Sequence, residues 1–252
     1  MEEEYRTEMK TNISSNMSSS AEVYSDKMRF SCILFLIAIS TALAVSVTIK
    51  TVVFPSETNV DYVEMTPVRP LNLKAFTLCM RVATELPSER EIILFAYRTP
   101  EADELNLWRL KDGSVGLYLS TSADSESVNF HVPHLGALET HLCVTWDSST
   151  GATDLFMNGR KSLTKIYKPG HTMRPKGKVV IGQDFDSYAG YLDAKQSFVG
   201  EMSDVNMWDS VLCDTTIKGM SSGMRVPRGN VLDWEGPELK RHGGAKVLNR
   251  EL

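Results

Sequence analysis

HLCVTWDSSTGATDLFMNG, residues 141–159, decides the fold class of this 252-residue chain. Residues 142–146 and 153–157 form short apolar runs bounded by Asp, Ser and Gly, which is typical of β-strands. Asn158-Gly159 follows the second run and suits the positive backbone φ angles of a tight hairpin turn. The stretch therefore predicts short strands joined by tight turns.

The same pattern continues through the body of the chain. Further strand-like runs cover residues 51–54, 62–65, 75–82, 92–97, 105–110, 115–119, 178–181 and 198–208. Asp112-Gly113 is a second turn signal, and residues 160–178 read as a solvated loop and an edge strand. Long segments whose apolar residues recur at the period of a helix are missing. We therefore predict an all-β, two-sheet antiparallel sandwich. One short helix is expected at residues 214–220, with Asp214 as its N-cap.

The N-terminal region differs from the rest in composition. Residues 1–27 are polar and Ser-rich, so we expect a disordered leader. Residues 28–44 read as a signal peptide that starts at Met28 and ends with the small-residue pattern Ala42-Leu43-Ala44. Residues 30–49 carry no charge, so an uncleaved signal anchor is the alternative. The first reading predicts a secreted protein, and the second a single-pass type II membrane protein. In both, residues 45–252 form one domain.

Oxygen-bearing side chains are concentrated between residues 180 and 209. Asp184, Asp186, Asp193 and Gln196 lie within 13 residues of one another. Carboxylates this near to one another repel unless a cation lies between them. A set of ligands made up only of oxygens suits Ca2+. A solvated turn is the alternative reading, since Asp and Gly are common in turns.

The spacing excludes an EF-hand. With Asp184 as its first ligand, Tyr188 and Lys195 would occupy positions that need oxygen ligands. An irregular loop is therefore expected, with peptide carbonyls such as that of Phe185 completing the coordination shell.

Two motifs together resemble the pentraxin family. One is the acidic loop, and the other is residues 141–148, which match the pattern His, any, Cys, any, Ser/Thr, Trp, any, Ser/Thr. Residues 76–79 and 206–209 match as well, and the resemblance runs from about residue 47 to residue 234. It implies a jelly-roll sandwich of the concanavalin or laminin-G kind, with a helix on one face and the calcium loop on the other.

The resemblance also implies a disulfide. It pairs Cys79 with Cys143, which would close a 64-residue loop and stabilise the fold by about 4 kcal/mol. Cys213 is then left over, either as a buried free thiol or as a link to another chain. Cys32 lies inside the hydrophobic N-terminal segment.

The site implied by the family holds two calcium ions per subunit. Its matching ligands are Asp103, Asp184, the carbonyl of Phe185, Asp186, Asp193 and Gln196. The family's Asp-Asn pair falls on Ala102-Asp103, so its first position lacks a side-chain oxygen unless Glu101 reaches in through a one-residue shift. Trp108 falls where an apolar residue packs beside a choline headgroup, and its ring offers cation–π attraction. Ser127 falls near the position of the expected acidic partner, with Glu126 and Asp124 close by.

The function that follows is a secreted, calcium-dependent recognition protein of innate immunity. Phosphocholine, phosphoethanolamine and glycans are the expected ligands, a homopentameric ring the expected assembly, and complement components further partners. A net charge of −5 argues against a nucleic-acid partner. A glycosidase would need two facing carboxylates. Glu201 and Asp204 are the nearest pair, but three residues apart on a strand they should point to opposite faces, so no enzyme is expected.

Overall fold

A computed structural model describes residues 24–25, 27–28, 48–121, 126–188, 190–224 and 226–251. Its compact β unit spans Thr48–Glu251. The predicted leader and the signal or anchor segment lie almost entirely outside these residues, so both stay predictions.

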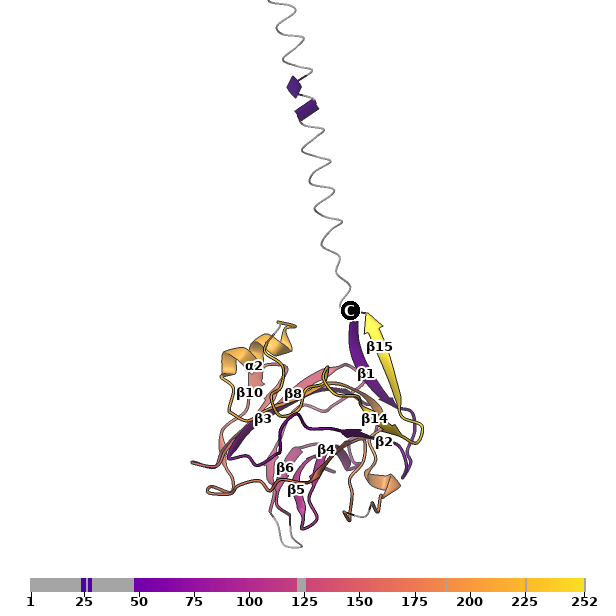
Figure 1. Cartoon of the computed structure of the whole chain (residues 1–252), viewed down its shortest axis with the longest axis vertical. Helices are drawn as coiled ribbons and strands as arrows, with labels where there is room; N and C mark the ends of the chain where they lie inside the picture. The colour runs from indigo at the N-terminus through magenta and orange to yellow at the C-terminus, as the bar shows by residue number, and fades with distance from the viewer. Residues whose placement is uncertain are drawn as a thin grey trace, which may run out of the picture. The chain divides into compact units, whose positions relative to one another are not determined.

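Two antiparallel sheets form the β unit (Figure 1). The eight-stranded sheet A has the order β10-β9-β8-β3-β13-β1-β15, with β11 also paired to β9. Its strands are β1 (Thr48–Phe54), β3 (Ala75–Ala83), β8 (Thr140–Asp147), β9 (Ala152–Met157), β10 (Arg160–Lys161), β11 (Lys165–Ile166), β13 (Gly200–Trp208) and β15 (Lys246–Glu251).

The seven-stranded sheet B has the order β14-β2-β12-β4-β5-β6-β7. Its strands are β2 (Tyr62–Met65), β4 (Ile92–Arg98), β5 (Asp103–Arg109), β6 (Val115–Leu119), β7 (Val128–Phe130), β12 (Lys178–Ile181) and β14 (Lys240–His242). Two further elements are the 3-10 turn η1 (Ala194–Gln196) and the helix α2 (Asp214–Ser221). The predicted all-β sandwich with one short helix is confirmed.

Alternation along the strands separates the core from the outer faces. On β3, Phe76, Leu78 and Met80 belong to the main hydrophobic core, whereas Cys79 belongs to a second cluster. This is the period of two expected for a strand with one residue set on each face. On β5, Leu105 and Leu107 belong to the core, which places Asn106 on the outer face of sheet B.

The turn predicted at Asn158-Gly159 joins β9 to β10. Asn158 has φ 50° and Gly159 has φ 74°, and Met157 pairs with Arg160. Positive φ at both central residues identifies a type I′ turn, whose twist matches that of the flanking strands.

Helix α2 covers the outer face of sheet A. Ile217 and Met220 pack against Phe156, Trp208 and the disulfide-bonded Cys79 and Cys143. The predicted pairing of the two cysteines is confirmed. The position of the helix agrees with the helix-bearing face that the resemblance implied.

Two details at the start of α2 correct the sequence prediction. Cys213, not Asp214, is the N-cap residue, and Asp214 is the first residue of the helix, where its charge complements the helix dipole. Cys213 is exposed, not buried. Its Sγ lies 3.2 Å from Thr215 Oγ1 and 2.9 Å from Thr216 Oγ1. The hydroxyls of Thr215 and Thr216 lower the pKa of the thiol to about 7.

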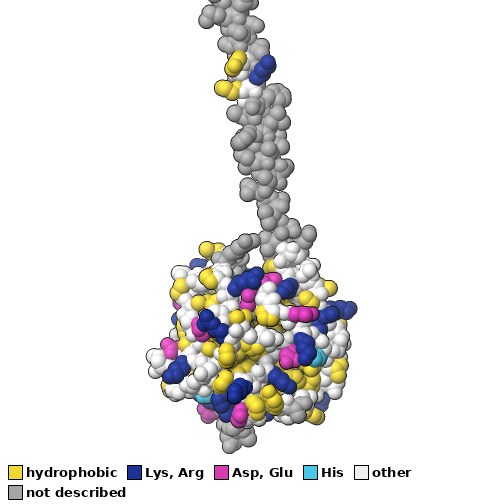
Figure 2. All heavy atoms as spheres, in the orientation of Figure 1, with side chains coloured by type: hydrophobic (Ala, Val, Ile, Leu, Met, Phe, Trp, Pro, Cys, Tyr) yellow, Lys and Arg dark blue, Asp and Glu magenta, His cyan; other side chains and the backbone are white. Residues whose placement is uncertain are grey.

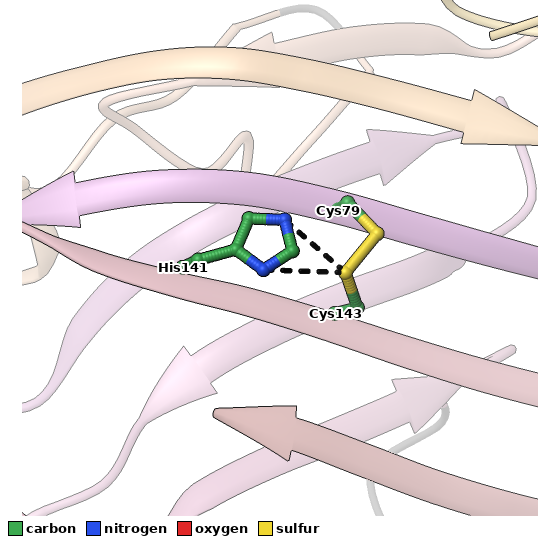
Figure 3. Close-up of side chains that lie close together, drawn as sticks. All are labelled: Cys79, His141 and Cys143. Carbon is green, nitrogen blue, oxygen red and sulfur yellow. Dashed lines mark hydrogen bonds between the residues drawn. A yellow bond between two sulfur atoms is a disulfide. The ribbon is translucent and has the colours of Figure 1, made fainter. Parts of the chain in front are cut away.

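His141 packs against the disulfide (Figure 3). Its side chain is buried, and its Nε2 lies 3.6 Å from Cys143 Sγ. His141, Cys79 and Cys143 cluster closely enough to suggest a metal site, but metal-binding sulfur is thiolate. Both sulfurs are in the disulfide, so the role of His141 is structural.

The stability of the fold should fall as the pH drops below the ordinary pKa of histidine, because the unfolded chain binds a proton that the buried His141 does not. Burial, then the positive charge of Arg81, lowers the pKa of His141 to about 4. In the unfolded chain the pKa of this histidine is near 6.5. The stabilisation from the neutral, buried His141 is therefore complete above about pH 6.5, and about 3 kcal/mol of it is lost as the pH falls towards 4. Urea unfolding at pH 7 and at pH 4.5 measures this loss of stability, and His141→Gln should remove it. His131→Gln, an exposed control, should retain it, and equal pH dependence in His141→Gln and wild type would contradict the account.

The ends of the β unit lie side by side. In Figure 1, β1 runs beside β15, and Ile49 pairs with Arg250. Thr48 and Ile49, the last residues of the uncharged run, are therefore strand residues. Among the described residues, no helix has the length and apolar character needed to cross a membrane.

Candidate metal centre

The acidic residues lie on the loop between β12 and β13, residues 182–199, which we name the acidic loop. Its base is closed by a hydrogen bond from the Phe198 N–H to the Gly182 carbonyl (3.0 Å). Gly182 has φ 88°, and a Cβ there would overlap the ring of Phe54. Glycine is therefore required where the loop leaves the sheet.

Aromatic side chains hold the outer part of the acidic loop. The Lys178 ammonium lies 5.8 Å from the ring centre of Phe185 and 4.8 Å from that of Tyr188. Phe185 is buried and packs edge-on against Tyr62. The chain then turns back, with the Asp186 N–H donating to the Tyr191 carbonyl (3.0 Å).

Arg90 supports the part of the loop that carries η1. Its guanidinium donates to the carbonyls of Ala194 (2.9 Å), Lys195 (3.2 Å) and Ser197 (3.2 Å), and it pairs with Glu57. Asp193 is the N-cap of η1 and accepts from the Lys195 N–H. These contacts fix the turn that carries Asp193 and Gln196.

Asp184 lies on the buried side of the acidic loop, against strand β5. Its side chain is buried, and its Oδ2 accepts from Asn106 Nδ2 (3.1 Å). Burial, then the negative charges of Asp103 and Asp186, raises the pKa of Asp184 to about 7. Arg98 opposes this shift without cancelling it. A buried carboxylate surrounded by acids favours either a proton or a cation.

Asp186 and Gln196 meet on the solvent side of Asp184. Gln196 hydrogen bonds to the Asp186 carboxylate. Burial, then the charges of Asp103 and Asp193, raises the pKa of Asp186. These charge effects show that the four acids predicted from the sequence lie near one another, but among the described residues no three of their carboxylates converge closely enough to hold one ion.

Asp103 stands at the edge of this group. Its Oδ1 accepts from Arg98 Nη1 (2.6 Å), and its Oδ2 accepts from the Thr121 hydroxyl (3.3 Å). Both oxygens therefore already have protein partners.

The donor set fits a hard cation. Asp184 Oδ1, Asn106 Oδ1 and Gln196 Oε1 are buried and have no hydrogen-bond partner in the described structure. A buried polar atom without a partner costs about 1–3 kcal/mol, so such groups normally have one. All three are oxygens, which are the ligands that Ca2+ prefers. Asn106 was missed from the sequence; its signal is an amide between two core leucines.

The residues expected on the ligand side lie on β5 and just before β7. Trp108 is half-buried on β5, two residues beyond Asn106 and on the same face of sheet B. Ser127 donates to Asn129 Oδ1 (2.6 Å), Glu126 is exposed, and Asp124 lies outside the described residues. A groove of about 480 Å³ borders the acidic loop. It is lined by Glu57, Glu89, Arg90, Glu91, Lys111, Asp193, Lys195 and Gln196.

Each acid of the alternative pair has an arginine as its partner. Glu201 pairs with Arg250, and Asp204 lies 3.5 Å from Arg81. On the face shown in Figure 2, basic and acidic side chains of the described residues are intermingled.

Comparisons with known proteins agree with this architecture. The model of the pentaxin family matches residues 50–248. The C-reactive protein of Danio rerio is 50% identical over 200 residues, covering 79% of this chain and 88% of that protein. The serum amyloid P-component of Cavia porcellus is 34% identical, covering 83% of this chain and 92% of that protein.

A solved structure shares the fold. The native heptameric SAP-like pentraxin from Limulus polyphemus superimposes with a TM-score of 0.69 at 23% identity, over 79% of this chain and 94% of that chain. The family model and the sequence relatives define the class: the chain belongs to the pentaxin (pentraxin) family.

Proposed function

We propose that this chain is a secreted, calcium-dependent pattern-recognition protein of innate immunity. It binds ligands that carry phosphate or carboxylate groups, such as phosphocholine, phosphoethanolamine and glycans. The observation that carries this proposal is the set of buried, unpartnered oxygens on the acidic loop and on the adjacent strand β5. A divalent cation would satisfy these oxygens and neutralise the surrounding acids.

Two ions per subunit are held, in this proposal, by Asp103, Asp184, the carbonyl of Phe185, Asp186, Asp193 and Gln196. The bound ions supply positive charge for the oxygens of the ligand. The chain's own residues hold the loop: Arg90 fixes the turn of η1, and Lys178 anchors Phe185. Trp108 packs beside a choline headgroup.

Charges beside the loop suit a ligand with both signs. The groove that Asp193 and Gln196 border also carries Glu89 and Glu91. An ammonium group at one end of a ligand gains from such carboxylates, while its phosphate lies at the metal.

Assembly into a ring strengthens binding in this proposal. Weak sites on one face of a homopentamer gain affinity by multivalency when the target surface is repetitive. The Limulus polyphemus pentraxin is a heptamer. Its ring size therefore differs from that of the pentamer that we propose for this chain.

Retention on immobilised phosphocholine tests the proposed function. The wild-type protein should bind in millimolar Ca2+ and elute in EDTA, and Asp186→Ala should not be retained. Asp147→Ala, on a β8 end in the other sheet, is the matched control and should bind normally. Retention that persists unchanged in EDTA would refute the proposal.

A type II membrane-anchored adhesion or receptor protein is the second candidate. Its support is the uncharged stretch at residues 30–49, whose last two residues lie in β1. The binding face would be the same. N-terminal sequencing of secreted protein separates the two: a start near Val45 supports secretion, and an intact segment in membrane fractions supports the anchor.

A further inference from the structure

The part of the proposed calcium site next to β5 lacks a side-chain oxygen. Ala102 carries none, and its carbonyl already accepts from the Thr99 N–H (2.9 Å). Both carboxylate oxygens of Asp103 have partners, in Arg98 and Thr121. A calcium ion needs six to eight oxygen ligands, and the Ala102 side chain supplies none, so this part of the site needs a further side-chain donor.

Asn106 lies where such a donor is needed. It is 3% exposed, on the face of β5 that the acidic loop covers. Its Nδ2 donates to Asp184 Oδ2, and both heteroatoms belong to one planar amide, so Oδ1 also lies beside Asp184. Asn106 Oδ1 and Asp184 Oδ1 are both buried without a partner.

We infer that Asn106 is a calcium ligand of this chain and supplies, through Oδ1, the side-chain oxygen that Ala102 does not provide. The inference rests on the proposed calcium binding and extends it to a residue outside the expected ligand set. One cation between the amide and the carboxylate satisfies two oxygens whose burial is otherwise unfavourable.

The neighbours of Asn106 make a purely structural role a poor explanation. Leu105 and Leu107 on either side are core residues, and cross-strand partners are Ala96 on β4 and Tyr118 on β6. An apolar residue at this position would fill the space without an unsatisfied acceptor. The amide instead carries a buried oxygen without a hydrogen-bond partner, and a bound cation would satisfy it.

Calcium titration of Asn106 variants tests the inference. Isothermal calorimetry with Ca2+ alone should give two ions per wild-type chain. In Asn106→Leu, of similar volume, one ion should be lost or bound at least tenfold more weakly. Asn106→Asp keeps an oxygen and should retain both ions. Asn249→Ala, on the exposed face of β15, is the matched control and should bind like wild type.

Terbium luminescence gives a second readout that does not depend on ligand binding. Asn106→Leu should lower the number of Tb3+ ions bound, provided that its circular dichroism in EDTA matches wild type. If Asn106→Leu fails to fold, Asn106→Ala takes its place. Unchanged ion number and affinity in the folded variant would overturn the inference alone, whereas a wild-type protein that binds no Ca2+ would overturn the proposed function with it.

Discussion

Asp184→Asn is expected to raise the stability of the calcium-free protein while abolishing its response to calcium. At pH 8 the wild-type carboxylate is ionised and buried, and its pKa of about 7 shows that the charge is unfavourable there. The amide removes this charge, so the variant should be more stable in EDTA by up to about 4 kcal/mol.

Calcium should reverse that order. At a concentration 100 times the dissociation constant, two ions stabilise a protein by about 5 kcal/mol, or roughly 10–20 °C for a domain of this size. Wild type should show this increase in melting temperature and Asp184→Asn little of it. Asp209→Asn, an exposed control, should respond like wild type. A calcium response that survives Asp184→Asn would contradict the assignment of Asp184 as a ligand.

Removing the disulfide is expected to have the second large effect. The Cys79–Cys143 bond closes a loop of 64 residues and lies under helix α2. Cys79→Ala combined with Cys143→Ala should lower the free energy of unfolding by about 4 kcal/mol, because the unfolded chain gains conformational freedom. Denaturant unfolding measures the loss.

Cys213→Ala is the matched control for that experiment. Cys213 is exposed and outside the disulfide, so its replacement should change the free energy of unfolding by no more than about 0.5 kcal/mol. A double alanine variant as stable as Cys213→Ala would show that the disulfide contributes little.

The centre of the sandwich was predictable from sequence because its strands carry a clear pattern. Residues 142–146 and 153–157 became β8 and β9, and Asn158-Gly159 became the turn to β10. In these segments apolar composition, turn chemistry and tertiary position agree, so local reasoning was sufficient.

The edge strands were not predictable in the same way. β14 (Lys240–His242) is wholly polar, and β15 (Lys246–Glu251) is largely so. They form because β2 and β1 offer backbone hydrogen bonds at the sheet edges, which a local pattern does not reveal. Cys213 was misjudged for a related reason, since the orientation of a helix N-terminus depends on packing.

The acids of the site were predictable, but the geometry that connects them was not. Asp184, Asp186, Asp193 and Gln196 are close in sequence and lie together in the structure. Asn106 is 78 residues from Asp184 and meets it because the acidic loop folds over β5. Arg90 supports η1 from 104 residues away. Such contacts follow from sheet topology, which spacing along the chain does not report.

Calorimetric titration of the purified wild-type protein with Ca2+ tests the central claim most directly. The account predicts saturable binding of two ions per chain, accompanied by proton release at pH 7 as Asp184 ionises. No heat of binding up to millimolar Ca2+, with an unchanged melting temperature, would contradict it.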